Sequence, residues 1–428
     1  MILEYPMLAE RVYTCTARCG LPIRVLLRPG FSRKVAYFAT DFGSIHRDFR
    51  LDGREYHVPA GTAHFLEHKM FELPGRDVSG EFAALGANVN AFTSYDMTAY
   101  YFSCCDHFGE NLRLLLEFVS TPCFPAESVR REMGIIDQEI GMNEDVPESR
   151  VFDDLMRQIY TVHPIREPIL GSRESIRQLT PASLECCHRA FYTPENMILC
   201  VAGDVDPAQV TALVDEVLLT CRRPAGEKLR RWQEPMAAVT ALRRQKMEVP
   251  MPTFQMACKC EPTGTGEAAI RREIVGDLAA EALFGEASAL YLALYSQGKI
   301  DGSFGGGFDS VDGCAMLTCG GDSWEPEAVR DAVLSAAAEI ARDGLPEADF
   351  LRMKRSAMGR RVRELDSFDS TCVRICAYYF GGYDYLDFPR IYTQVTQAEI
   401  QEFLRRVVTP ERCALSVIDP LDTEEDMQ

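Results

Sequence analysis

The chain has 428 residues, 46% of them hydrophobic and 25% charged, and a formal net charge of −19. Such proportions are typical of a globular protein, and the length exceeds what one hydrophobic core usually organises, so we expect two or more domains. Because a strongly negative surface repels phosphate backbones, we expect no nucleic-acid partner. The chain has no uninterrupted run of about 18 apolar residues and no N-terminal targeting pattern, so we expect no membrane partner and a cytoplasmic location.

The sixteen cysteines are scattered along the chain, and no two of them form a C-x-x-C pair. Their spacing therefore favours neither a zinc ribbon nor a disulfide framework. Cys372 and Cys376 are four residues apart and could share one helix face, but we interpret them as small buried side chains rather than metal ligands.

Strands and helices come in blocks along the first half of the chain. Apolar runs bounded by turn residues predict strands, and apolar residues spaced three and four apart predict helices. In chain order we expect strands at 11–13, 23–27 and 35–41, a short helix near 62–70, a hairpin of strands 87–93 and 97–102, and helices at 110–119 and 127–142. We expect Thr62 to cap the short helix and Pro74-Gly75 to end it. Blocks of this kind are typical of an α+β fold.

The short helix reads TAHFLEHKM and contains two histidines and a glutamate in H-x-x-E-H order. His64 and His68 are four residues apart, so on a helix both rings project from one face and can share a metal ion. Glu67 lies on the same side, next to such an ion. The pattern therefore predicts a metal site with a carboxylate beside it.

A zinc ion in a catalytic site takes three protein ligands and leaves one position for water. The later helix offers two acidic residues as the third ligand, Glu132 and Glu139, which are seven apart and share one face. We expect Ile135 and Ile136 to pack between them. One carboxylate would bind the ion and the other would hydrogen-bond a liganding histidine, and the spacing leaves open which does which.

The alternative is that His64 and His68 are ordinary surface residues of an amphipathic helix. All seven histidines occur at or before His188, so the second half of the chain has none. This uneven distribution favours one metal site located in one half.

A sequence repeat relates the two halves. The segment LTPASLECCHRAFYTPENMILCV at 179–201 aligns without a gap with VTQAEIQEFLRRVVTPERCALSV at 395–417, 216 residues later. Both copies predict a threonine cap, an amphipathic helix, a Thr-Pro-Glu turn and a buried strand. We therefore expect two homologous halves of α+β type. We place the first half at 1–222, a basic linker with prolines at 223–249, and the second half at 250–428.

Four segments resemble the pitrilysin family of peptidases, the inverzincins, in order and spacing. They are GTAHFLEHKMFE at 61–72, GANVNAFTSYDMTAYYF at 86–102, EMGIIDQEIGMNEDVP at 132–147 and FYTPENMILCVAGDV at 191–205. The resemblance covers nearly the whole chain and is closest to the bacterial processing-peptidase-like members. It implies two paired halves, each a mostly antiparallel sheet packed with helices, around a clam-like substrate cleft.

The resemblance also assigns roles to the metal-site residues. It implies that His64, His68 and Glu139 hold one zinc ion, that Glu67 is the general base, and that Glu132 hydrogen-bonds a liganding histidine. Glu144 is an alternative third ligand.

The resemblance further assigns the strand Asn90-Ala91-Phe92-Thr93 to the family's N-A-x-T segment, which adds an extended peptide to a sheet edge. For Phe92, packing inside the hairpin is an equally good interpretation. The implied function is that of a zinc metalloendopeptidase acting on extended peptides or small precursors. The alternative is a non-catalytic structural or peptide-binding subunit of a processing-peptidase-like complex.

The second half departs from the family pattern at one place. Members of the family carry an Arg-x6-Tyr pair there, but the corresponding stretch, LYLALYSQGKIDGSFGGG at 290–307, contains no arginine. Tyr295 and Phe304 lie near the expected positions without supplying the same donors. We therefore expect a dimer, formed with a related zinc-free subunit that supplies the Arg/Tyr pair. The three glycines that end this stretch predict a bulged strand.

Overall fold

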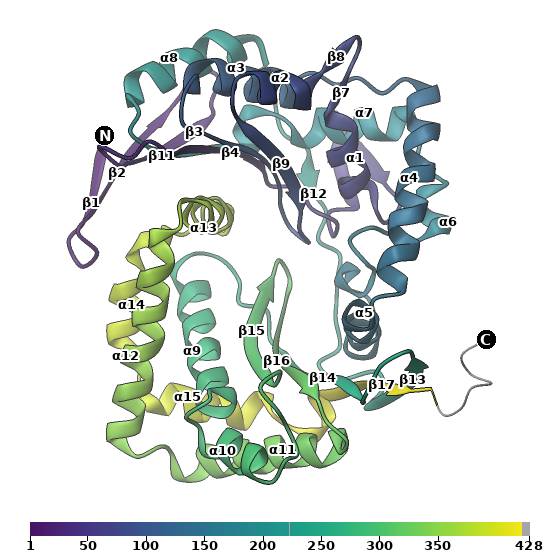
Figure 1. The fold of residues 1–428 in the computed structure, drawn as a ribbon, viewed down its shortest axis with the longest axis vertical. Helices are drawn as coiled ribbons and strands as arrows, with labels where there is room; N and C mark the ends of the chain where they lie inside the picture. The colour runs from purple at the N-terminus through teal and green to yellow at the C-terminus, as the bar shows by residue number, and fades with distance from the viewer. Residues whose placement is uncertain (222, 422–428) are drawn as a thin grey trace. The chain divides into compact units, whose positions relative to one another are not determined.

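The computed structural model describes residues 1–221 and 223–421, which form two compact units (Figure 1). The first unit comprises Met1–Ile140, Pro168–Arg230 and Val362–Asp387. The second comprises Gly141–Glu167, Arg231–Arg361 and the chain from Phe388 onward. Each unit combines a sheet with surrounding helices, so the α+β class and the two-domain architecture are confirmed. The predicted cleft and the residue boundaries at 222 and 249 stay predictions.

The first unit is built on a seven-stranded sheet. Its strands, in spatial order, are β1 (Ile2–Tyr5), β2 (Glu10–Thr16), β3 (Pro22–Leu27), β11 (Met197–Gly203), β4 (Lys34–Thr40), β10 (Thr98–Cys104) and β9 (Asn88–Thr93). All neighbours pair antiparallel except β3 and β11, which are parallel. Two small sheets, β12–β5–β6 and β7–β8, complete its strands (Glu227–Lys228, Asp48–Leu51 and Arg54–His57; Glu72–Leu73 and Arg76–Asp77).

Helices cover both faces of this sheet. Those of the first unit are α1 (Thr62–Met70), α2 (Val78–Ala84), α3 (Phe108–Ser120), most of α4 (Ala126–Glu144), α6 (Arg173–Ile176), α7 (Pro181–Phe191), α8 (Pro207–Leu218) and α13 (Phe368–Phe380). Figure 1 shows α13 on the opposite side of the sheet from α3 and α8. This explains why every residue of β11 is buried, since a strand covered on both faces has no polar side.

The second unit contains a five-stranded sheet. Its strands, in spatial order, are β13 (Leu242–Met247), β17 (Cys413–Pro420), β14 (Thr253–Cys260), β16 (Cys314–Asp322) and β15 (Gly305–Val311). Its helices are α5 (Pro147–Ile159), α9 (Gly266–Phe284), α10 (Ala289–Ser296), α11 (Pro326–Asp343), most of α12 (Glu347–Arg363), α14 (Phe388–Gln394) and α15 (Gln397–Val407). The glycines at the start of β15 pair in regular register with β16, so the expected bulge there is wrong.

The repeat predicted from the sequence is confirmed by the two sheets. Thr180 and Thr396 cap α7 and α15 with capping boxes, and each helix leads through a 3-10 turn into a buried strand, β11 or β17. Both strands have a parallel neighbour on one side and an antiparallel neighbour on the other: β3 and β4 for β11, β13 and β14 for β17. The strand order β3-β11-β4-β10-β9 therefore corresponds to β13-β17-β14-β16-β15.

The chain exchanges one helix between its halves. Helix α13 comes from the second half of the sequence but packs on β11 and β4 of the first unit. Helix α5 comes from the first half but packs on β17 and β14, the matching strands of the second unit. Gln158 near the end of α5 donates to the Leu415 carbonyl at 3.1 Å. The compact units are discontinuous because of this exchange.

One stretch of the described chain, from Gly266 to Ser296, is long and apolar enough to cross a membrane by length and composition alone. In the structure it consists of two helices, α9 and α10, and α9 packs against β15 with Ile274 and Leu278 fully buried. Since a core helix passes the same test, this stretch is weak support for a membrane span.

Candidate metal centre

The N-cap of helix α1 lies one residue before the predicted cap, Thr62. Gly61 is the N-cap with a positive φ of 87°, and a side chain there would meet the Leu170 carbonyl oxygen at 2.4 Å, so glycine is required. Thr62 is the first helical residue and makes no capping bond; its hydroxyl donates to the Pro59 carbonyl at 2.6 Å. The expected Thr62 cap is therefore wrong, and the helix ends at Met70, before Pro74.

Helix α1 holds the two histidines firmly because most of its surface is buried. Phe65 and Leu66 have no exposed surface, and Met70 is 1% exposed. The rings of His64 and His68 lie one turn apart with centroids separated by 4.6 Å. The helix thus presents both imidazoles on one side, as the four-residue spacing predicts.

Glu139 brings a carboxylate from α4 to the two rings. Its Oε1 lies 3.5 Å from His64 Nε2, and its Oε2 lies 3.7 Å from His68 Nε2. Within the described ranges, these three residues form the one group of histidine, cysteine or acidic side chains whose donor atoms converge within 4.8 Å. Glu144 is not part of that group.

Glu132 approaches His68 from the other side of the ring. Its Oε1 accepts a hydrogen bond from His68 Nδ1 at 3.1 Å. Because a carboxylate can only accept, Nδ1 carries the proton and the lone pair of Nε2 is left facing Glu139. Between the two glutamates, Ile136 is buried but Ile135 is 49% exposed, so the expected packing of Ile135 is wrong.

Glu67 lies on the same helix and is bound by a residue of β9. The hydroxyl of Thr93 donates to Glu67 Oε2 at 2.5 Å. Burial raises the pKa of the Glu67 carboxyl, and the Thr93 hydrogen bond and the two histidines oppose this rise. Glu67 is 9% exposed, so it is a carboxylate held almost out of water next to the three donor groups.

The pKa values of His68 and Glu139 shift in the directions expected where imidazoles and carboxylates lie close together. The hydrogen bond to Glu132 raises the pKa of the His68 imidazole, against the effect of burial. The contact with His64 lowers the pKa of Glu139 despite partial burial. The charged forms of His68 and Glu139 are therefore both stabilised by their neighbours in this cluster.

Strand β9 is the last strand of its sheet. It pairs with β10 on one side, and among the described residues no strand pairs with its other side. Asn90 is exposed and its side-chain oxygen accepts from the Ala91 amide at 2.8 Å. Phe92 lies 6.4 Å from the Tyr101 ring, centroid to centroid. The predicted N-A-x-T segment thus lies along an edge that ends beside Glu67.

The sequence did not single out Lys69, which follows His68 directly. Its side chain has no exposed surface, although lysine is rarely buried without a partner. It contacts Glu72 and Ser128, and its Nζ lies 3.9 Å from Glu132 Oε2. Because Lys69 directly follows Glu67 and His68, no local pattern in the sequence marks it as buried.

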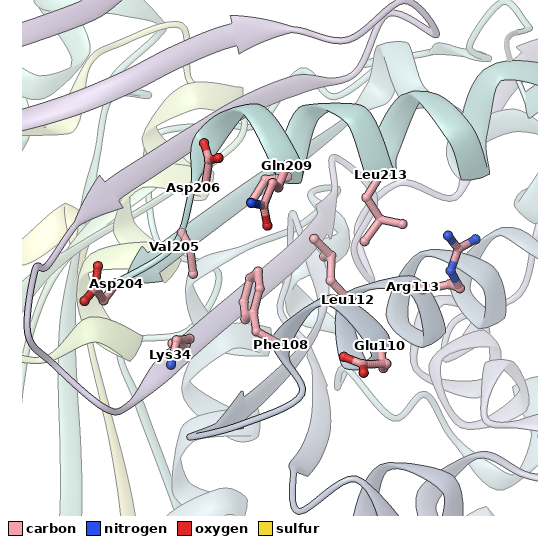
Figure 2. A pocket seen from close by; sticks show the side chains of 12 residues that line it. Lys34, Phe108, Glu110, Leu112, Arg113, Asp204, Val205, Asp206, Gln209 and Leu213 are labelled. Carbon is pink, nitrogen blue, oxygen red and sulfur yellow. The ribbon is translucent and has the colours of Figure 1, made fainter.

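A cavity of about 750 Å³ opens elsewhere in the first unit, between α3 and α8 (Figure 2). Phe108, Leu112 and Leu213 project into it, and Arg113 on its rim donates to Glu216. None of the metal-site residues lines this cavity. It therefore takes no part in the metal centre.

Comparison with known proteins places the whole chain in one family. Residues 54–173 match the model of the insulinase family, peptidase family M16, and residues 178–357 match the model of the M16 inactive domain. The "uncharacterized zinc protease YmfH" of Bacillus subtilis is 33% identical over 427 residues, which cover 98% of this chain and 99% of that protein.

Solved structures agree with this match. A crystal structure described as an M16-like peptidase, from Alicyclobacillus acidocaldarius, superposes with a TM-score of 0.93 at 31% identity and covers 98% of this chain and 100% of that one. A Helicobacter pylori protease shares the fold alone, with a TM-score of 0.82 at 16% identity over 96% of this chain and 100% of that one. The resemblance to the pitrilysin family drawn from the sequence is thus confirmed, and the chain belongs to the insulinase family of peptidases, family M16.

Proposed function

We propose that this chain is a zinc-dependent endopeptidase that hydrolyses extended peptides or small precursors. The observation that supports it most directly is the convergence of the His64, His68 and Glu139 donor atoms within 4.8 Å, with the Glu67 carboxylate on the same helix as the histidines. The relative YmfH is itself named a zinc protease, which agrees with this proposal.

The three donor groups fit a zinc ion. Ligand atoms bound tetrahedrally to zinc at about 2.0–2.2 Å lie about 3.3–3.6 Å from one another. The separations of 3.5 Å and 3.7 Å between Glu139 and the two histidine nitrogens are close to that range and are long for direct hydrogen bonds. His64, His68 and Glu139 would hold the ion. A zinc ion bound there supplies a Lewis acid that lowers the pKa of a coordinated water to about 7.

Glu67 is placed to act as the general base. Its Oε2 accepts the Thr93 hydroxyl, which fixes the carboxylate and leaves Oε1 to take a proton from water. Because the pKa of this carboxyl is raised toward neutral pH, the group can take the proton and later give it to the leaving amine. At 9% exposure the carboxylate has little contact with bulk water.

The edge of β9 offers a place for the substrate backbone. An extended peptide can add to such an edge by main-chain hydrogen bonds, which read chain shape more than side-chain identity. Because Thr93 ends this strand and binds Glu67, a peptide paired along β9 would run toward the base. This supports endopeptidase action on extended segments.

Substitution of Glu67 by glutamine tests the assignment. We expect Glu67→Gln to retain one zinc per chain and to lose cleavage of a quenched fluorescent peptide by about 10²–10⁴-fold, the range for loss of a general base. A Glu67→Gln protein as active as the parent would contradict the role of Glu67. A parent that binds zinc but cleaves nothing, either alone or with a related subunit that carries the Arg/Tyr pair, would favour the non-catalytic subunit instead.

We propose further that the active form includes a related zinc-free subunit. In the stretch 290–307, which contains no arginine, Tyr295 is 55% exposed while Phe304 is 5% exposed and packs 6.1 Å from the Phe284 ring. A buried phenylalanine cannot donate a hydrogen bond to a substrate carbonyl. We expect cleavage to rise when a paralogue carrying an Arg-x6-Tyr pair is added. Full activity of the chain alone would contradict this.

A further inference from the structure

An ionic cluster centred on the buried Lys69 lies next to the metal centre and reaches the surface at Glu72 and Arg131. Lys69 Nζ contacts Glu72 Oε2 and Ser128 Oγ, and Ser128 Oγ donates to Glu72 Oε2 at 2.5 Å. Arg131 donates to the other Glu72 oxygen at 2.9 Å. The cluster thus uses Glu72 of β7 to join α1 and α4, the two helices that carry the metal-site residues.

Glu132 connects this cluster to the metal centre through its two oxygens. Oε1 accepts from His68 Nδ1 at 3.1 Å, while Oε2 faces Lys69 Nζ at 3.9 Å. Two of the three ammonium donors of Lys69 go to Glu72 and Ser128, so one remains for Glu132. The side chain of Glu132 is 13% exposed, which leaves little water to stabilise its charge.

We infer that Lys69 is a positioning residue of the metal centre: its ammonium group holds the Glu132 carboxylate aimed at His68, and so increases the affinity of the site for zinc. This inference rests on the proposed function. By accepting from His68 Nδ1 at 3.1 Å, Glu132 fixes the ring and keeps its Nε2 lone pair toward the ion.

The competing view is that Lys69 merely ties α1 to α4. The second unit contains a matched case: Lys259 is 1% exposed, donates to Glu234 at 2.8 Å and to the Pro235 carbonyl at 2.7 Å, and lies over the Tyr160 ring. It has the same burial and the same kind of partner, but it is part of the unit without the candidate metal group. Lys259→Met is therefore the control for loss of a buried lysine.

Zinc affinity, measured by competition with a chromophoric chelator on the full chain, provides the test. We expect Lys69→Met to weaken zinc binding about 10-fold or more, the size found for partners of metal ligands, and Lys259→Met to change it by less than about twofold. In a Glu132→Gln background, where Lys69 no longer faces a carboxylate that binds His68, we expect Lys69→Met to weaken binding by less than about threefold. Dependence on Glu132 is the readout that a merely structural lysine would not produce.

Each other outcome overturns the inference. If Lys69→Met binds zinc as tightly as the parent, or weakens binding equally in both backgrounds, Lys69 does not act through Glu132, while the proposed function stands. If Lys69→Met does not fold, Lys69→Met/Glu72→Gln, which removes both charges of this ion pair, replaces it with the same expected loss. A parent chain that binds no zinc overturns the proposed function and this inference together.

Discussion

The two sheets of this protein share one strand order but differ beside their edge strands. In the first unit, α1 packs against β9, and the contact includes the hydrogen bond from Thr93 to Glu67. In the second unit, α9 packs against β15, and the contact is apolar and close: a side chain at Gly276 would meet the Phe308 ring at 2.3 Å. The same scaffold thus carries polar groups at one edge and a tight hydrophobic joint at the other.

This difference indicates that the duplicated strands determine the fold of each unit, while a few side chains determine whether a unit can bind a metal ion. The second unit has one histidine, His163, whose Nε2 lies 2.8 Å from the Asp312 carbonyl and whose Nδ1 accepts from the Ile165 amide. Burial lowers the pKa of this imidazole, which keeps it neutral. Both ring nitrogens are used inside the protein, so this histidine is structural rather than a metal ligand.

The largest effect should come from removing the third ligand. We expect Glu139→Gln to weaken zinc binding by more than about 100-fold, beyond the range for residues that only support a ligand, and to abolish peptide cleavage. Glu144→Gln on the same helix is the control and should leave both unchanged. Zinc titration and a peptide assay measure this, and equal losses in both variants would contradict the choice of Glu139.

Zinc removal should destabilise one unit more than the other. Binding to the folded state at 100 times the Kd stabilises by about 2.7 kcal/mol. We expect calorimetry of the full chain to show a zinc-dependent shift in the transition of the first unit, and none in His64→Ala. A shift that persists in His64→Ala would place the metal elsewhere.

The apolar contact between α9 and β15 in the second unit should affect the stability of the protein but not its zinc binding. We expect Gly276→Ala to destabilise the protein by about 1–3 kcal/mol, because the Phe308 ring is also held against Phe403 at a centroid distance of 5.8 Å. Gly359→Ala in α12, where nothing lies within 4 Å of the added carbon, should stabilise slightly. Denaturant unfolding measures the change in stability of both variants, and zinc titration measures their affinity for zinc. Weaker zinc binding in Gly276→Ala would contradict the expectation that this contact does not affect the metal centre.

The smallest effect should come from removing the Thr93 hydroxyl, which links β9 to Glu67. The Thr93 hydrogen bond opposes the rise in the Glu67 pKa caused by burial, so Thr93→Val should raise that pKa further. Because Glu67 must be ionised to take a proton, the acidic limb of the pH-rate profile should move to higher pH, and kcat/KM should fall by about 10-fold at neutral pH. Thr93→Ser keeps the hydroxyl and should behave like the parent. If the acidic limb of the pH-rate profile does not move in Thr93→Val, the Thr93 hydroxyl does not control the pKa of Glu67.

The sequence anticipated the parts of the structure that follow from local spacing. His64 and His68 on one helix face, the hairpin that contains β9, and the repeated helix-turn-strand all follow from periodicity within short segments. Helical spacing could not select Glu139 as the third ligand, because Glu139 and Glu132 share one helix face. Only the family resemblance distinguished the two residues. The cytoplasmic location and the zinc-free partner stay predictions.

Features that depend on tertiary packing could not be read from spacing. Thr62 resembles a cap, but the close approach of the chain at Leu170 requires Gly61 there instead. The exchange of α5 and α13 joins segments that are distant in the sequence, so no local pattern marks it. The burial of Lys69 depends on groups contributed by two other segments, Glu72 and Ser128.

X-ray absorption of the zinc-loaded chain tests the central claim most directly, because it reports which atoms bind the ion. We predict nitrogen and oxygen neighbours at about 2.0–2.2 Å with imidazole scattering from two histidines, and loss of stoichiometric zinc in Glu139→Gln. The chain also has sixteen cysteines, all with free thiols in the structure. A sulfur shell at about 2.3 Å, or zinc that stays stoichiometric in Glu139→Gln, would contradict the site formed by His64, His68 and Glu139.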